Sequence, residues 1–227
     1  MIPKLIHQTY RDYELPEIYA LCAQQMRALH PDYTYKFWTD DEMYTFMRTE
    51  FPTYWSKFSA LPRVIMQVDM FRYFLLYKYG GIYADLDYYM LRPLDGIFAA
   101  MRDAKKEVLL PANNETFDGR VVGVGNCILA SHPGHPFWKK LMDSLFTIDR
   151  YTAVDFDDDI NVDSEFGTGS AFVYNTWRAY SADDATIFMP RTAMFHPPSK
   201  QSLMYLERLR AQGAYGMHWG LRLWRFQ

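Results

Sequence analysis

Residues 68–87 read V-D-M-F-R-Y-F-L-L-Y-K-Y-G-G-I-Y-A-D-L-D, and this stretch decides the fold. It carries most of a helix, a glycine pair, the start of a strand and three carboxylates. After Pro62, which fits the first turn of a helix, apolar residues recur at three- and four-residue spacing as far as Tyr79. This spacing predicts a helix over 63–79. Gly80-Gly81 are its expected end. Because few of its residues are polar, we expect this helix to be buried on nearly every side.

Asp69 and Arg72 carry opposite charges in the middle of this apolar helix. They are three residues apart, so they share one face. A charged pair on a buried helix costs desolvation unless hydrogen bonds satisfy both partners. The residues alone therefore fit a structural ion pair and a functional pair equally well.

The segment from Ile82 to Met90 alternates in polarity after the glycine pair. If it is extended, Asp85 and Asp87 point to the same side, about 6–7 Å apart. Such like charges raise each other's pKa unless a cation lies near them, and oxygen donors of this kind suit Mg²⁺ or Mn²⁺ together with phosphate oxygens. A D-x-D pair alone is weak evidence for a metal site, because two aspartates on a surface turn are common.

The whole string is far more specific than the aspartate pair. It resembles the D-x-x-R…G-G-x-Y-x-D-x-D core of the glycosyltransferases with a DXD sugar-binding region, matching it at Asp69, Arg72, Gly80, Gly81, Tyr83, Asp85 and Asp87. That family, similar to glycosyltransferase family 32, includes Och1-like mannosyltransferases and bacterial capsule and lipooligosaccharide sugar transferases. At this core it also resembles the catalytic domain of the large clostridial glucosylating toxins.

The first ten residues extend the resemblance. Residues 2–10, I-P-K-L-I-H-Q-T-Y, are similar to the family's opening I-P-K-x-I-H-Q-x-W, and 4–9 are expected to form a strand ending at a ligand crevice. The resemblance implies that His7, Gln8, Thr9 and Tyr10 bind the donor, with Tyr10 stacking on the base where the family has Trp. On the residues alone, His7 is more simply a strand-end histidine and Tyr10 a packing residue.

Two later stretches also resemble the family. Residues 123–130, G-V-G-N-C-I-L-A, are similar to a strand with an early Asn, which implies that Asn126 bonds a sugar hydroxyl; a turn asparagine is the alternative. In the tail, His218-Trp219 and Trp224 resemble a closing H-x-W…S-W, although Arg222-Leu223 replace the G-S before the last Trp. The resemblance implies that His218 helps to hold metal and that Trp224 closes over the nucleotide. Gly167 to Ser170 resemble the family's T-G-P turn, with Ser170 in place of Pro.

The resemblance implies a single GT-A domain over 1–227, an α/β, Rossmann-like nucleotide-sugar-binding fold with a mixed, mostly parallel sheet flanked by helices. It implies transfer with retention of configuration and a Mn²⁺ or Mg²⁺ cofactor. In that frame Asp87 coordinates the metal, and Asp85 touches ribose and sugar, or the metal through water. Asp69 and Arg72 hold sugar hydroxyls, and Tyr83 lines the pocket.

Regular elements are expected along the rest of the chain. Further strands are predicted over 33–38, 108–111 and 186–189, and further helices over 15–29, 41–48, 133–146 and 171–180. Thr39 or Asp40 is expected to cap the helix beginning at Asp41. Residues 51–60 form a linker or short helix, 113–119 a polar loop, and 155–165 an acidic solvated loop without EF-hand spacing.

Length and composition limit the function. The 227 residues suit one well-buried domain, and a net charge of −3 gives no general attraction for nucleic acid. Cys22 and Cys127 are most simply buried thiols in a reducing compartment. No signal-peptide core opens the chain and no run approaches 18 apolar residues, so we expect no transmembrane segment. The chain is expected to be a cytoplasmic enzyme, which its start at Met1 favours, or else an excised domain.

The expected partners are a nucleotide-sugar donor, linked to UDP or GDP, and a glycan, lipid-linked sugar or protein acceptor. Two other functions compete with this interpretation. A metal-dependent phosphohydrolase also uses D-x-D, but near its N-terminus and before a Thr-containing turn, whereas Tyr88-Tyr89 follow here at mid-chain. A non-catalytic nucleotide-sugar-binding module would bind the donor without transfer.

Overall fold

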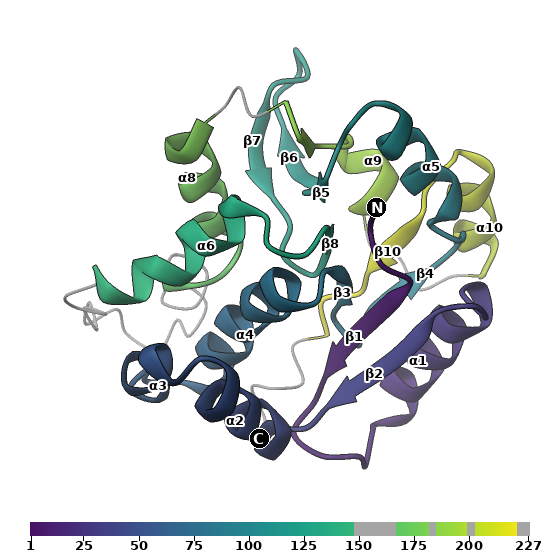
Figure 1. Ribbon diagram of the computed structural model, residues 1–227. Helices are drawn as coiled ribbons and strands as arrows, with labels where there is room; N and C mark the ends of the chain where they lie inside the picture. Colours follow the sequence, from purple (N-terminus) through teal and green to yellow (C-terminus); the bar gives the residue numbers. More distant parts are fainter. Residues whose placement is uncertain (148–166, 182–184, 199–202, 222–227) are drawn as a thin grey trace, which may run out of the picture.

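The computed structural model describes residues 1–147, 167–181, 185–198 and 203–221 (Figure 1). Its centre is a six-stranded sheet in the order β2-β1-β3-β8-β5-β9. The strands are β1 (Leu5–Thr9), β2 (Thr34–Trp38), β3 (Gly81–Ala84), β5 (Val108–Leu109), β8 (Ile128–Ser131) and β9 (Ile187–Phe188). The β1–β2, β1–β3 and β5–β9 pairs are parallel, and β8 runs antiparallel to both of its neighbours. The expected mixed, mostly parallel sheet is confirmed.

Helices cover both faces of this sheet (Figure 1). They are α1 (Glu17–Leu29), α2 (Asp40–Glu50), α3 (Pro52–Ser59), α4 (Val64–Lys78), α5 (Asp95–Asp103), α6 (Pro136–Asp143), α8 (Ser170–Ser181), α9 (Thr192–Phe195) and α10 (Leu203–Ala211), with a 3₁₀ turn at Ser144–Phe146. In the described part of the chain, no helix is both long enough and apolar enough to cross a membrane.

Two hydrophobic cores form because side chains alternate along each strand. On β3, Tyr83 packs with α2, α3, α4 and α6, while Ile82 and Ala84 pack on the opposite face with residues of α1 and α5. On β8, Leu129 joins the first core and Ile128 the second. The central strands β3 and β8 are thus buried on both faces, and this packing fixes the position of the end of β3.

The α4 helix confirms the predicted helix over 63–79 and its burial. Its residues 69–76 are all buried. Gly80 and Gly81, with φ of 63° and 84°, then turn the chain directly into β3. A Cβ on Gly81 would lie 2.5 Å from the main-chain oxygen of Leu5, and one on Gly80 would lie 2.6 Å from that of Ser131. Only glycine lets β3 enter between β1 and β8 here.

The predicted strand from Ile82 to Met90 is wrong, because the chain turns in the middle of it. β3 ends at Ala84, and the amide of Tyr88 donates to the main-chain oxygen of Asp85 at 3.0 Å, closing a turn over 85–88. β4 (Tyr88–Met90) then leaves the central sheet and pairs antiparallel with β10 (Gly216–His218). This change of sheet brings the C-terminal region beside the D-x-D residues.

The region from 112 to 131 also differs from its prediction. The expected polar loop over 113–119 contains β6 (Ala112–Glu115), which pairs antiparallel with β7 (Val121–Val124) in a hairpin. The expected strand over 123–130 is divided between β7 and β8, with Asn126 in the bend between them. The other elements expected in the described residues are confirmed within a few residues, and Thr39 caps α2 through a capping box with Glu42.

Several predictions fall outside the described residues. They concern the acidic stretch 155–165, residues 222–223 and Trp224.

Candidate active site

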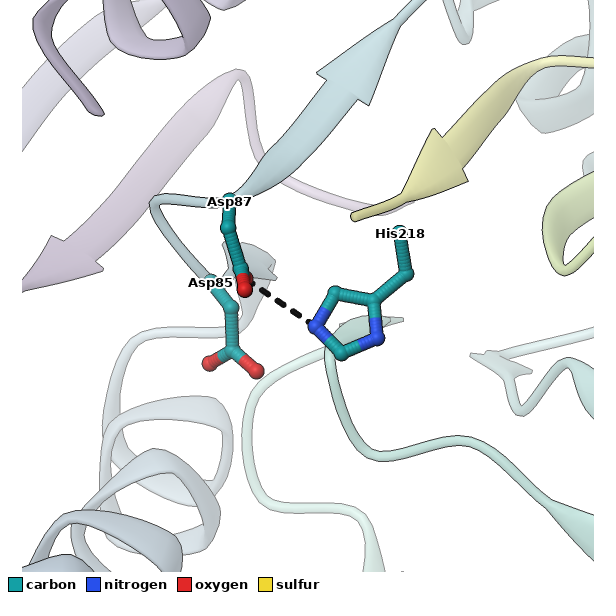
Figure 2. Close-up of side chains that lie close together, drawn as sticks. All are labelled: Asp85, Asp87 and His218. Carbon is teal, nitrogen blue, oxygen red and sulfur yellow. Dashed lines mark hydrogen bonds and ion pairs between the residues drawn. The ribbon is translucent and has the colours of Figure 1, made fainter. Parts of the chain in front are cut away.

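The acidic centre lies where β3 ends and the turn toward β4 begins. Asp85 follows the last residue of β3, Asp87 precedes the first residue of β4, and His218 closes β10 (Figure 2). Because β4 and β10 pair with His218 opposite Tyr88, the imidazole reaches the aspartates from the far end of the chain. One potential ligand atom from each of the three side chains lies within 4.8 Å of the other two.

Asp87 is held by the C-terminal region. Its carboxylate lies 3.0 Å from Nε2 of His218 and accepts the amide of Leu221 at 2.8 Å, and its main-chain oxygen accepts the amide of Trp219 at 3.0 Å. Burial alone would raise the pKa of Asp87, but the hydrogen bond and charge of His218 hold it below its ordinary value. Asp87 is therefore an ionised carboxylate.

Asp85 is the more exposed of the two aspartates, with 26% of its side chain exposed against 10% for Asp87. Its carboxylate accepts the hydroxyl of Tyr83 at 3.0 Å and lies 3.4 Å from Nη1 of Arg72. Burial raises the pKa of Asp85; Arg72 opposes that increase and the charge of Asp87 adds to it. A cation between the two carboxylates would remove their repulsion.

The donor set fits a divalent cation. Two carboxylates and an imidazole whose atoms converge within 4.8 Å are ligands that Mn²⁺ accepts readily, and the oxygens suit Mg²⁺. Because Asp85 is partly exposed, a bound cation would keep positions open for phosphate oxygens or water.

Asp69 and Arg72 form the centre of a buried polar network. Asp69 accepts from Nη2 of Arg72 at 2.7 Å, from Nδ2 of Asn126 at 3.0 Å and from Oγ1 of Thr168 at 3.1 Å. Arg72 also donates to the main-chain oxygen of Asn126 at 2.5 Å and stacks over the ring of Tyr83 at 4.6 Å. Burial raises the pKa of Asp69 to about 6, against the effect of Arg72. The network joins α4, the β7–β8 bend and the start of α8 to Asp85.

The end of β1 supports the same turn. Gln8 is fully buried; its amide donates to the main-chain oxygen of Asp85 at 3.3 Å, and its carbonyl accepts the hydroxyl of Tyr35 at 2.9 Å. The hydroxyls of Thr9 and Tyr83 lie 3.1 Å apart, and Tyr83 in turn donates to Asp85, so Thr9 is connected to Asp85 through Tyr83. Both residues of β1 thus help to position the acidic turn, and donor contact by them stays a prediction.

His7 and Tyr10 lie in different surroundings. The imidazole of His7 is fully buried, accepts from Nε1 of Trp38 at 3.1 Å and donates to the main-chain oxygen of Gly80 at 3.2 Å. With both nitrogens engaged in the core, His7 has a structural role, and donor contact by it stays a prediction. Tyr10 is half-buried and makes an edge contact with Tyr19, their ring centroids 5.5 Å apart, in a cluster that includes Leu86.

Three residues near the site were not predicted as functional. Thr168 lies in the glycine-rich turn 167–170, whose sequence indicates only a turn before a helix. Cys127 directly follows Asn126, but a buried thiol is the simplest interpretation of its sequence context. His196 carries no local motif and reaches Cys127 only through the fold, with Nε2 at 3.2 Å from Sγ.

Comparisons with known proteins support the family resemblance. Residues 16–104 match the model of the glycosyltransferase sugar-binding region containing a DXD motif. The chain is 34% identical over 180 residues to mannosyl phosphorylinositol ceramide synthase SUR1 of Saccharomyces cerevisiae, covering 79% of this chain and 43% of that protein. It is 35% identical over 144 residues to inositol phosphoceramide mannosyltransferase 3 of Schizosaccharomyces pombe, covering 63% of this chain and 37% of that protein. The chain thus spans less than half the length of these relatives.

Solved structures show the same fold. The UDP-bound glycosyltransferase domain from the YGT toxin superposes with a TM-score of 0.57 at 10% identity, covering 83% of this chain and 79% of that one. The PaToxG glycosyltransferase superposes with a TM-score of 0.51 at 14% identity, covering 79% of this chain and 69% of that one. The fold is that of GT-A-type glycosyltransferases, and the matched region carries their DXD motif. More narrowly, the chain belongs to the family whose sugar-binding region contains the DXD motif, together with the yeast mannosyltransferases that it resembles.

Proposed function

We propose that this chain is a metal-dependent, retaining glycosyltransferase that moves a sugar from a UDP- or GDP-linked donor to a hydroxyl of an acceptor. The observation that carries the proposal is the convergence of Asp85, Asp87 and His218 within 4.8 Å at the carboxyl end of β3. In open α/β sheets, ligands bind at the carboxyl ends of the strands. The acidic centre therefore lies where a nucleotide sugar is expected.

The proposed roles follow from the surroundings of each side chain. Asp87 and His218 hold Mn²⁺ or Mg²⁺, and the more exposed Asp85 reaches the ribose and sugar, or the metal through water. The metal, when bound, neutralises the charge that grows on the departing diphosphate. Arg72 orients Asp85 through an ion pair, and Asp69 balances the charge of Arg72. Contact of Asp69 and Arg72 with sugar hydroxyls is part of the proposal.

Retention is proposed to proceed by attack on the front face of the sugar. The bond from the anomeric carbon to the diphosphate breaks, the acceptor oxygen bonds to that carbon, and the acceptor proton passes to the departing diphosphate. Asp69 is unsuited to be a nucleophile, because Arg72, Asn126 and Thr168 all donate to its two oxygens. The anomeric configuration of the isolated product, read by NMR, tests retention.

The names of the relatives suggest a donor and an acceptor class. One is named as a synthase of mannosyl phosphorylinositol ceramide, the other as an inositol phosphoceramide mannosyltransferase. We propose mannose as the sugar and a hydroxyl-bearing glycan or lipid headgroup as the acceptor. A protein side chain is the remaining acceptor class.

The test is release of nucleoside diphosphate from a panel of UDP- and GDP-sugars, with Mn²⁺ and with EDTA. Asp87→Asn keeps the shape of the side chain but removes its charge, so we expect release to fall on the order of 100-fold. Asp103→Asn, on the exposed surface of α5, is the matched control and should retain full activity. Full activity of Asp87→Asn, or in excess EDTA, would refute the metal assignment.

The two competing functions give different results in the same assay. Release of phosphate from simple phosphoesters would indicate a phosphohydrolase. Donor binding in calorimetry without turnover, for every acceptor class offered, would indicate a binding module.

A further inference from the structure

Tyr35 is connected to the acidic turn although it lies outside the site, on the edge strand β2. Its hydroxyl donates to Oε1 of Gln8 at 2.9 Å. Nε2 of Gln8 in turn donates to the main-chain oxygen of Asp85 at 3.3 Å. Two hydrogen bonds therefore lead from β2 through β1 to the first aspartate of the D-x-D motif.

The register of the first two strands brings Tyr35 to Gln8. β1 and β2 run parallel and Tyr35 pairs with Ile6, so these two side chains lie on one face of the sheet and pack in the same core. Gln8 is two residues beyond Ile6 on β1, so it points to that face as well. The separation along the strand is about 6–7 Å, which the long side chain of a tyrosine spans.

The acceptor at the end of this path fixes the direction of both hydrogen bonds. A carbonyl oxygen only accepts, so Gln8 must turn its amide nitrogen toward Asp85 and its oxygen toward Tyr35. Burial raises the pKa of Tyr35 to about 12, so its hydroxyl keeps its hydrogen and donates it to Gln8. Because Gln8 is fully buried, loss of the hydroxyl would leave its Oε1 without this donor in a place where an unpaired acceptor is costly.

Gln8 helps to hold the main chain of Asp85. The amide of Asp85 donates to the main-chain oxygen of Cys127 at 2.8 Å, which ties the turn to the residue before β8. The main-chain oxygen of Asp85 accepts from the amide of Tyr88, which closes the turn, and from Gln8, which ties it to β1. The carboxylates of Asp85 and Asp87 both branch from this turn, so its orientation decides where they point.

We propose that Tyr35 is a positioning residue for the acidic turn: its hydroxyl holds the carboxamide of Gln8 in the orientation that fixes the main chain of Asp85. The inference rests on the metal-dependent function proposed above, because a misplaced Asp85 would weaken the binding of metal and donor. Tyr35 acts through Gln8 and contacts neither of them. The alternative role is packing alone, since the ring also lies against the guanidinium of Arg27, 5.1 Å from the ring centroid, and borders a cavity.

Tyr35→Phe removes the hydroxyl and keeps the ring, so it separates the two roles. We expect the Kd for Mn²⁺, measured with UDP or GDP present by the EPR signal of free Mn²⁺, to rise about 3- to 10-fold, the effect of one lost hydrogen bond. The kcat for nucleoside diphosphate release should fall by a similar factor. Tyr33→Phe is the matched control: Tyr33 packs against the same core, but its hydroxyl donates to Asp95 at 3.3 Å, so both values should stay unchanged.

A double-mutant cycle tests the path through Gln8. Gln8→Met removes both hydrogen bonds at once, so adding Tyr35→Phe to it should change neither the Kd nor the kcat further. Thermal unfolding of each variant confirms that the fold is retained.

The outcomes separate this inference from the proposed function. Wild-type Mn²⁺ affinity and turnover in Tyr35→Phe, even with a lower thermal stability, would leave Tyr35 a packing residue and overturn the positioning role, while the metal centre would stand. Additive losses from Tyr35→Phe and Gln8→Met would overturn the path through Gln8. Absence of both Mn²⁺ binding and donor cleavage in the wild type would overturn the proposed function and the positioning role together.

Discussion

Nη2 of Arg72 lies 2.7 Å from Oδ1 of Asp69, one turn earlier on α4, where 2% and 5% of the two residues are exposed. The same guanidinium lies 3.4 Å from Asp85. The pair is thus an element of the core and the support of the D-x-D turn at the same time. The two interpretations that the sequence allowed, structural pair and functional pair, describe the same contacts.

Removing one partner of this pair should be far more damaging than removing both. Arg72→Met leaves the Asp69 carboxylate buried without its cation, and we expect a loss of about 3–5 kcal/mol in the free energy of unfolding. Asp69→Asn combined with Arg72→Met removes both charges, so its loss should be smaller than the sum of the single losses. Urea unfolding of the two single variants and the double variant measures this coupling.

The same variants separate stability from catalysis. Arg72→Met also removes the cation beside Asp85, so any residual folded enzyme should show a raised KM for donor or a lower turnover. A double variant that folds well and keeps wild-type kinetic constants would mean that the pair acts on stability alone. Additive losses in the unfolding cycle would mean that the two charges are not coupled.

The end of α4 shows why part of this fold was predictable. Apolar periodicity and two adjacent glycines are local signals, and they predict both the helix and its end correctly. The turn at Asp85–Asp87 was missed because alternation over 82–90 also fits a continuous strand. The strand is interrupted because β4 pairs with β10, which lies more than 120 residues later in the chain.

Gly81 gives a direct test of the local part of this argument. Its φ is 84°, and a Cβ there would lie only 2.5 Å from the main-chain oxygen of Leu5, so Gly81→Ala should lower the free energy of unfolding by about 2–4 kcal/mol. Gly96→Ala, in the first turn of α5 and with open space around it, should be neutral or stabilising by about 0.5–1 kcal/mol. Chemical denaturation of both variants makes the comparison, and equal effects would contradict the steric argument.

The acidic site was predictable only in part, for the same reason. Asp85 and Asp87 form a motif in sequence, and the family resemblance added His218. Which atoms meet is decided by tertiary contacts: Thr168 and Asn126 reach Asp69 from segments 99 and 57 residues away. His7 shows the opposite limit. Its place beside the motif residues suggested ligand contact, but the pairing of β1 with β2 turns the ring toward Trp38 and into the core.

The buried ring of His7 should make stability depend on pH. Burial, and to a smaller extent the charge of Lys36, lower its pKa from 6.5 to about 4, against the opposing hydrogen bond to Gly80. Between those pH values the unfolded chain binds more protons than the folded one, so stability is full above about pH 6.5 and falls as the pH drops toward 4. From pH 7 to pH 5, this group alone should cost about 2 kcal/mol.

His7→Gln removes the titrating ring, so the variant should lose less stability than the wild type over the same interval, whatever its stability at pH 7. Urea unfolding at pH 7 and pH 5 gives the two differences. The matched control is His132→Gln, because that ring is only partly buried and its pKa is also lowered, mainly by burial. Its pH dependence should stay closer to that of the wild type. An unchanged pH dependence in His7→Gln would show that another group carries the acid sensitivity, and that the ring of His7 is not held neutral by the core.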